Sequence, residues 1–123
     1  MKVLVTRPIP SEGLDALRKK KYTLDIYEKD EVMPRKELLK RAKGVDAILS
    51  LLNDRVDAEL LDVAGPQLKL VANYAVGFDN VDLAAAKKRN VIVTNTPAPE
   101  VSETVAEHTF ALLMTLAHRV VES

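Results

Sequence analysis

The sequence predicts an α/β domain built on a doubly wound parallel sheet of five strands, followed by one long helix. Two observations support this class. Short, nearly continuous apolar runs alternate with amphipathic stretches in the order βαβαβαβαβα, and such runs are typical of parallel strands that helices cover on both faces. At 123 residues the chain is long enough for one domain with one core.

The first half of the chain supplies two strands and two helices. Residues 2–7 form a β-branched run that proline closes, which indicates a buried strand. Ser11 is placed to cap the helix that follows. Residues 22–28 alternate apolar and polar side chains, as a half-exposed or edge strand does. Pro34 suits the first turn of a second helix, which Gly44 ends.

The second half continues the alternation. We expect strands at residues 47–52, 68–75 and 91–94, and helices at residues 57–64 and 81–88. Successive parallel strands need right-handed crossovers. Five strands at this chain length fit the flavodoxin-like order 2-1-3-4-5, with the alternating strand at an edge.

The last helix is expected to begin at a Ser102 cap, after a proline-rich bend at residues 97–99, and to run to the end of the chain. It is apolar around most of its circumference, through a set of residues that does not form one stripe: Val105, Thr109, Phe110, Leu112, Leu113, Met114, Leu116, Ala117, Val120 and Val121. A helix beside a small sheet needs only one apolar stripe. We therefore expect its second face to pack on another domain or a partner subunit, most simply as a homodimer through this helix.

Composition excludes several classes of function. Lysine plus arginine and aspartate plus glutamate both number 18, so no net charge favours nucleic acid. The absence of cysteine excludes disulfides and thiolate chemistry. Polar residues interrupt the most apolar segment, 105–121, so we expect no membrane span, and the short apolar run at the amino terminus does not form a signal peptide. We expect a cytoplasmic protein.

One turn is shaped to receive a ligand. Val76 and Gly77 follow a predicted buried strand, and their consecutive N–H groups can form a small anion-binding nest. The carboxyl end of the preceding strand should place Leu52 and Asn53 at the same edge, where open α/β sheets bind ligands. A turn that simply needs a glycine is the alternative.

Other catalytic patterns are missing from the sequence. His108 and Glu107 are adjacent on a helix, so they point in different directions and form no obvious dyad; structural packing is the simpler role for His108 and His118. There is no metal-ligand spacing and no nucleophile with a local base. The four glycines form neither a GxGxxG nor a P-loop pattern. We assign no catalytic and no metal-binding residue.

Three stretches, LLNDRVD, LKLVANYAVGFDNVDLAAAKKRNVIVTNTP and SETVAEHTFALLMTLAHR, closely resemble the D-isomer-specific 2-hydroxyacid dehydrogenases, nearest to the glyoxylate and hydroxypyruvate reductase branch. The resemblance covers essentially the whole chain. It implies that the backbone amides of Val76 and Gly77 bind the carboxylate of a small 2-oxoacid and that Leu52 lines the substrate pocket. It also implies that Thr104 approaches the bound nicotinamide nucleotide.

The resemblance further implies a division of the chain. Residues 1–99 would be the flavodoxin-like substrate domain and residues 100–123 the crossing and dimerisation helix, with the nucleotide-binding domain absent. The NAD(P) cofactor and the catalytic arginine and histidine–glutamate pair belong to that missing part. We therefore expect the chain alone to bind no cofactor and to be inactive as a reductase. The alternative is an isolated folding or dimerisation module that binds no ligand.

Overall fold

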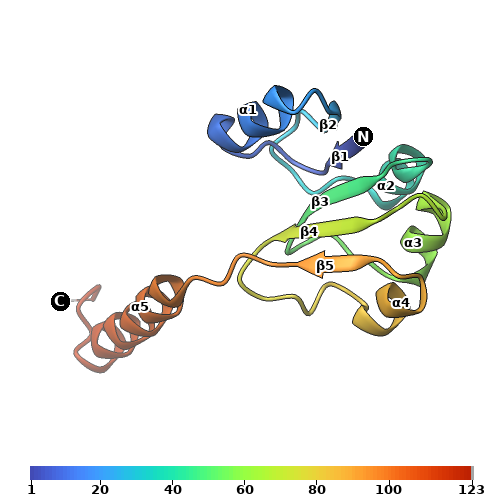
Figure 1. Cartoon of the computed structure of the whole chain (residues 1–123). Helices are drawn as coiled ribbons and strands as arrows, with labels where there is room; N and C mark the ends of the chain where they lie inside the picture. Colours follow the sequence, from blue (N-terminus) through green and yellow to red (C-terminus); the bar gives the residue numbers. More distant parts are fainter. Residues whose placement is uncertain (123) are drawn as a thin grey trace.

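The computed structural model describes residues 1–122 as a five-stranded sheet with helices against it and one long helix at the carboxyl-terminal end (Figure 1). The elements in chain order are β1 (Lys2–Val5), α1 (Ser11–Lys19), β2 (Thr23–Ile26), α2 (Arg35–Ala42), β3 (Ala47–Leu51), α3 (Ala58–Ala64), β4 (Leu70–Tyr74), α4 (Leu83–Lys88), β5 (Ile92–Thr94) and α5 (Pro99–Ala117).

The strand order is β2-β1-β3-β4-β5, and every neighbouring pair is parallel. This confirms the flavodoxin-like order and places the alternating strand β2 at an edge. Each observed strand is one to three residues shorter than the run that predicted it. The difference arises because the hydrogen bonds between strands stop one or more residues before the run of apolar residues stops.

Two helix starts differ from the predicted ones. Ser11 is the first helical residue of α1 rather than its cap, and Pro10 occupies the N-cap position. Helix α5 begins at Pro99, with Ala98 at the N-cap, so Ser102 lies inside the helix. A proline at the first helical position loses no hydrogen bond and already has a helical φ, which explains why α5 starts as early as Pro99. The helix also ends at Ala117 rather than at the end of the chain.

Aspartates cap the two short helices beside the candidate site. The Asp57 carboxylate accepts a hydrogen bond from the Leu60 N–H of α3 at 3.1 Å, and Asp82 accepts one from the Ala85 N–H of α4 at 2.8 Å. Each bond satisfies one of the unpaired donors of a helix start. Helix α3 ends at Gly65, whose φ of 96° is a conformation that side chains with a Cβ rarely adopt.

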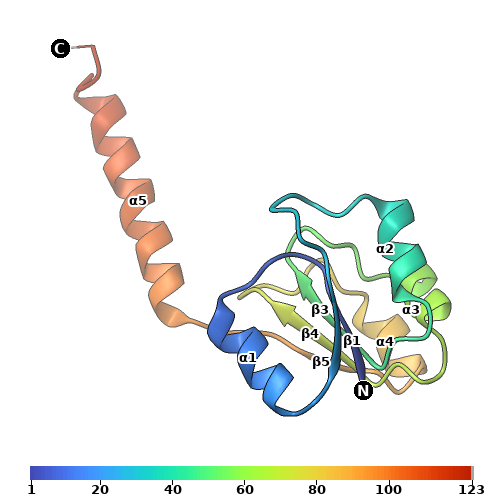
Figure 2. The same ribbon diagram turned by 90° about the horizontal axis from the view of Figure 1, so that it is seen from above.

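The two faces of the sheet carry separate cores. Helices α2, α3 and α4 cover one face, where they enclose the larger cluster around Leu4, Ile48 and Val71. Helix α1 covers the other face, where Leu14 packs against Val3, Val5 and Ala47. Figure 2 shows α1 on the opposite side of the strands from α2, α3 and α4. Helices on both faces are therefore confirmed.

Coverage of the α1 face is incomplete. In β3 and β4, Ile48 and Val71 point to the larger core and are fully buried, whereas their neighbours Leu49 and Leu70 are only half-buried. On β5, Ile92 is 64% exposed. Helix α1 covers this half of the sheet only in part, since Leu49 and Leu70 pack at the margin of the cluster around its Leu14, and α5 projects away from the sheet (Figures 1 and 2). None of the described residues of α5 is buried.

Candidate functional site

The candidate site is the pair of turns that follow β3 and β4 at the carboxyl edge of the sheet. The two strands pair up to Leu51 opposite Tyr74, so Leu52 and Ala75 follow at the same edge. Val76 and Gly77 come next in the β4 turn. The structure thus brings Leu52 to the same edge as the two glycine-turn residues, which is the arrangement predicted from the strand order.

A buried asparagine on β4 holds the glycine turn. Asn73 is 1% exposed. Its side-chain amide donates to the Gly77 carbonyl oxygen at 3.0 Å and to the Asn80 side-chain oxygen at 3.1 Å, and its own oxygen accepts from the Ser50 hydroxyl at 2.9 Å. Buried polar groups are costly unless they are hydrogen-bonded. Here every bond is made, so the turn is fixed to the two central strands.

The same network joins the β4 turn to the β3 turn. The Asn80 amide donates to the backbone carbonyls of Leu51 at 3.1 Å and Asp54 at 2.9 Å. The Asp54 carboxylate in turn accepts from the Leu51 N–H at 2.8 Å and from the Thr6 hydroxyl at the end of β1. Three neighbouring strand ends are therefore locked together by side chains that are buried or partly buried.

The backbone of the β4 turn presents free donors. The Val76 carbonyl accepts a hydrogen bond from the Asn95 side chain at 2.8 Å, and the Gly77 carbonyl is held by Asn73. The N–H groups of Val76 and Gly77 donate no hydrogen bond to any atom of residues 1–122. The peptide unit that carries the Val76 N–H is fixed through the Ala75 carbonyl, which accepts from the Thr96 N–H at 2.9 Å, and the unit that carries the Gly77 N–H is fixed through the Val76 carbonyl. Two consecutive N–H groups thus remain available to an anion.

Nothing within the described fold forces a glycine at position 77. Its φ is outside the left-handed region, and an added Cβ would meet only Asp79 Oδ2, at an ordinary 3.6 Å. A turn that needs glycine for its own conformation would have shown a positive φ or a close neighbour. Neither is present, and the missing side chain leaves the backbone at Gly77 open to a close approach from outside the fold.

The other predicted site residues lie in different surroundings. Leu52 is 63% exposed and Asn53 is also exposed, so neither belongs to the buried network. Thr104 is exposed on α5, where its hydroxyl donates to the Glu100 carbonyl of the same helix at 2.8 Å. Helix α5 stands apart from the sheet (Figure 2). The structure therefore does not bring Thr104 together with Val76 and Gly77.

The residues that build the network were not predicted from the sequence. Asn73 and Ser50 are the polar positions inside two otherwise apolar strands, and Asp54 and Asn80 lie in the turns. A polar side chain in a buried strand needs a partner. The polar residues inside apolar strands were visible in the sequence. The pairing of Ser50 with Asn73 depends on strand register, which cannot be read from the sequence.

A hollow of about 670 Å³ lies beside the β3 turn, lined by Val32, Met33, Arg35, Leu38, Asn53, Asp54, Arg55, Asp57 and Glu59. Its two arginines are already paired. The Arg35 guanidinium donates to Asp57 at 2.5 Å, to Glu59 at 2.7 Å and to the Arg55 carbonyl at 2.7 Å, and Arg55 Nε lies 3.0 Å from Asp57 Oδ2. Partial burial raises the pKa of Asp57, but hydrogen bonds from the Leu60 N–H and Arg35 lower it by more, so the pKa lies below its usual range. This hollow offers no free cation to an anionic ligand.

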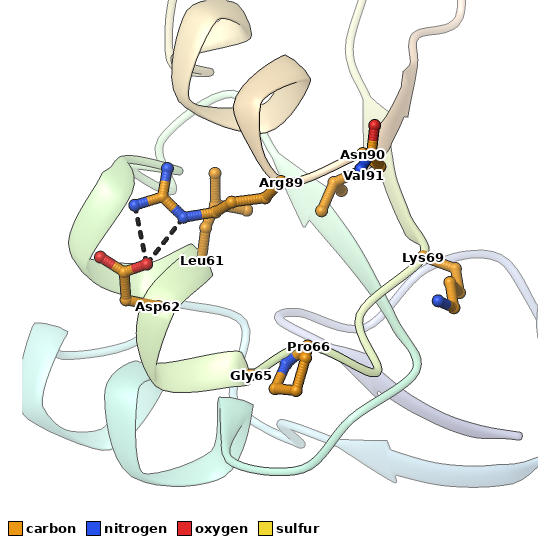
Figure 3. A pocket seen from close by; sticks show the side chains of 8 residues that line it. All are labelled: Leu61, Asp62, Gly65, Pro66, Lys69, Arg89, Asn90 and Val91. Atoms are coloured by element: carbon orange, nitrogen blue, oxygen red, sulfur yellow. Dashed lines mark hydrogen bonds and ion pairs between the residues drawn. The ribbon is translucent and has the colours of Figure 1, made fainter.

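A second hollow, of about 480 Å³, lies at the opposite, amino edge of the sheet and is lined by Leu61, Asp62, Gly65, Pro66, Lys69, Arg89, Asn90 and Val91 (Figure 3). Arg89 faces Asp62 across it, with its Nε and a terminal nitrogen both 2.7 Å from one carboxylate oxygen. The bond from Arg89 lowers the pKa of Asp62. Arg89 and Asp62 neutralise each other, but Lys69 of the lining has no acidic partner among residues 1–122. The hollow lies at the opposite edge from Val76 and Gly77, so it is not the predicted carboxylate site.

Other kinds of site are not found in the described part of the chain. Within residues 1–122 there is no group of three histidine, cysteine, aspartate or glutamate side chains placed to hold a metal ion. His108 and His118 are both exposed on or next to α5. No helix in this range has the length and hydropathy that crossing a membrane requires.

Fold and site together define a class: a doubly wound α/β domain that offers two backbone amides to a small anion at the carboxyl edge of its sheet. The profile of the D-isomer specific 2-hydroxyacid dehydrogenase catalytic domain matches residues 3–121. The chain belongs to this family, as the sequence resemblance predicted.

Individual relatives agree with this assignment. A glyoxylate reductase of Korarchaeum cryptofilum is 48% identical over 123 residues, which are 99% of this chain and 36% of that protein. The crystal structure of the TT0316 protein from Thermus thermophilus is similar with a TM-score of 0.86 at 43% identity, over 99% of this chain and 38% of that one. An NAD-dependent formate dehydrogenase from Staphylococcus aureus, in complex with NAD, has a TM-score of 0.75 at 26% identity, over 94% of this chain and 38% of that one. The chain thus spans little more than a third of the length of these relatives.

Proposed function

We propose that this chain is the substrate-binding part of an NAD(P)-dependent reductase of small 2-oxoacids, of which glyoxylate and hydroxypyruvate are examples. In this proposal the N–H groups of Val76 and Gly77 bind the substrate carboxylate, and Leu52 borders the bound molecule on the side of the β3 turn. The observation that carries the proposal is the pair of free N–H groups on a backbone whose two carbonyls are already held.

Charge-assisted hydrogen bonds explain why a carboxylate is the favoured ligand. A carboxylate has two oxygens that accept from N–H donors, and such bonds are roughly twice as strong as neutral ones. The network around Asn73 holds the donors in place before the ligand arrives, so little conformational entropy is lost on binding. The family name and the glyoxylate reductases among the relatives support a 2-oxoacid over other carboxylates.

The cofactor is assigned to the parent reductase rather than to these residues. Dinucleotide sites use a glycine-rich turn before a helix, and the four glycines here are at positions 13, 44, 65 and 77. Gly44 and Gly65, which have positive φ, lie after helices rather than before them. The described residues therefore do not fit a dinucleotide. We propose that Thr104 borders the nicotinamide nucleotide in the complete enzyme, and that residues 1–123 alone transfer no hydride.

A titration of the ¹⁵N-labelled chain with oxalate tests the carboxylate site. Oxalate resembles a 2-oxoacid and is chemically stable in the sample. We expect the largest amide shifts at Val76 and Gly77 at millimolar ligand. Ethylene glycol, which is a similar size but has no carboxylate, is the matched control and should move neither amide. Equal movement with both ligands, or no movement with oxalate, would contradict the proposal.

A second candidate function is a folding or dimerisation module that has no ligand site. The observation that favours it is helix α5, which has no buried residue and whose large apolar side chains are about half exposed or more. The oxalate titration separates the two candidates, because a module leaves Val76 and Gly77 unmoved. An assay of NADH oxidation with glyoxylate adds an independent check, in which turnover by the purified chain would disprove its expected inactivity.

A further inference from the structure

Two residues that follow β5 are attached to the glycine turn. The Thr96 N–H donates to the Ala75 carbonyl at 2.9 Å, and the Asn95 side-chain amide donates to the Val76 carbonyl at 2.8 Å. Both residues belong to the connection that leads from β5 towards α5 (Figure 1). We call residues 95–96 the exit segment. It contacts the proposed carboxylate site from the side of β5.

These attachments do not simply continue the sheet. In a parallel ladder, a donor bonds to the carbonyl that precedes its partner residue, as the Ile92 N–H does with Lys69 at 2.9 Å. Extended in the same register, Thr96 would donate to Asn73. The Asn73 carbonyl instead accepts from the Ala75 N–H at 2.9 Å, and Thr96 donates two residues further along, to Ala75. The exit segment is thus bonded to the turn itself rather than to strand β4.

Each attachment fixes a peptide unit that carries one of the free donors. The Ala75 carbonyl shares its peptide unit with the Val76 N–H, and the Val76 carbonyl shares the next unit with the Gly77 N–H. Because a peptide unit is planar, a carbonyl that is held sets the direction of the N–H on the opposite side. A hydrogen bond to the carbonyl also polarises the unit and strengthens its N–H as a donor. The exit segment therefore orients both donors.

Asn95 differs in this respect from the buried Asn73. Asn73 holds the Gly77 carbonyl, whose peptide unit carries the N–H of Phe78 rather than one of the two free donors. Asn95 holds the unit of the Gly77 N–H directly. It is partly buried and makes this contact with its side chain, so the contact can be removed while the backbone bond of Thr96 stays in place.

We propose that the exit segment sets the carboxylate affinity of the turn, with Asn95 as the positioning residue that aims the Gly77 N–H through the Val76 carbonyl. Asn95 has this role only where the turn binds a carboxylate, so the proposal rests on the proposed function above. Coupling between two sites is reciprocal. Since the attached exit segment favours carboxylate binding, a bound carboxylate favours the attached exit segment.

Oxalate titrations of ¹⁵N-labelled wild type and variants test the role of Asn95. We expect Asn95→Ala to bind oxalate about two- to tenfold more weakly, the equilibrium factor of one net hydrogen bond. Asn95→Asp should bind more weakly still, because an ionised carboxylate has no hydrogen to donate to the Val76 carbonyl and repels the anion. Asn90→Asp makes the same change on an exposed asparagine at the opposite edge of the sheet, and should bind oxalate as the wild type does.

Hydrogen exchange of the Thr96 amide in the wild type gives a second readout, which a purely structural role of the exit segment would not change. Saturating oxalate should slow this exchange about two- to tenfold, while the Ile92 amide at the start of β5 should change little. Wild-type binding that Asn95→Ala leaves intact, or an unchanged Thr96 exchange rate in saturating oxalate, would overturn this proposal and leave the carboxylate site standing. Absence of any oxalate shift at Val76 and Gly77 in the wild type would overturn both.

Discussion

Replacing Asn73 by alanine tests the network beneath the proposed carboxylate site. The substitution removes bonds to the Gly77 carbonyl, the Ser50 hydroxyl and the Asn80 amide, at 2.9–3.1 Å. Each buried partner that is left unsatisfied costs about 1–3 kcal/mol. The Asn80 amide nitrogen keeps two other acceptors, and water reaches the exposed Gly77. The stranded partners are therefore the Ser50 hydroxyl and Asn80 Oδ1, and we expect a loss of about 2–6 kcal/mol. That is a large share of a total of about 5–15 kcal/mol.

Urea unfolding followed by circular dichroism measures this loss as a lower midpoint at an unchanged slope. Asn53→Ala is the control, because Asn53 is exposed at the same sheet edge and its side chain bonds to no atom of residues 1–122. It should cost less than about 0.5 kcal/mol. Adding Ser50→Ala to Asn73→Ala should cost less than the sum of the two changes, because the stranded hydroxyl is removed. If Asn73→Ala costs no more than Asn53→Ala, the network does not hold the turn.

The remaining predictions concern the glycine turn, the helix cap and the two sheet faces. Gly77→Ala should change the unfolding free energy by less than about 1 kcal/mol, because its Cβ meets no close neighbour, yet reduce oxalate-induced amide shifts. Asp57→Ala should cost about 0.5–2 kcal/mol through loss of the α3 cap. The pKa of Asp57 is lowered by folding, so its ionised form stabilises the fold above about pH 4 and this stability is lost as pH falls further; the advantage over Asp57→Asn should therefore shrink in acid unfolding curves. Ile48→Ala should cost about 2–5 kcal/mol, and Leu49→Ala clearly less in the monomer, since Leu49 is only half-buried. Equal losses at the two positions would show that the α1 face of β3 is covered in solution as fully as the other face.

Much of the fold could be predicted because local patterns determine it. The alternation of apolar runs with amphipathic stretches is enough to place five strands and five helices, and right-handed crossovers leave few strand orders. The order β2-β1-β3-β4-β5 and the edge position of residues 22–28 were both confirmed. Helix starts were less predictable. In α1 the N-cap is Pro10 rather than the neighbouring serine, and in α5 the proline at position 99 is the first helical residue, three positions before the serine.

The turn at Val76 and Gly77 was visible in the sequence because a glycine follows an apolar run, and the strand order placed Leu52 at the same edge. The sequence did not show whether the N–H groups of this turn are hydrogen-bonded within the fold. That depends on Asn73 and Asn95, which hold the two carbonyls from positions 4 and 19 residues away, and a side chain's partner across a sheet follows from register.

By itself the sequence determined the class, the strand order, the family and the excess of apolar surface on the last helix. Only the tertiary structure decided which apolar side chains are buried. Leu49 and Leu70 are apolar in the sequence like the fully buried Ile48 and Val71, but they lie on the face of the sheet that α1 covers only in part. The physical reason is that an apolar side chain gains stability wherever it is buried. The direction in which Thr96 and Pro97 lead the chain determines which surfaces lie close enough to bury it.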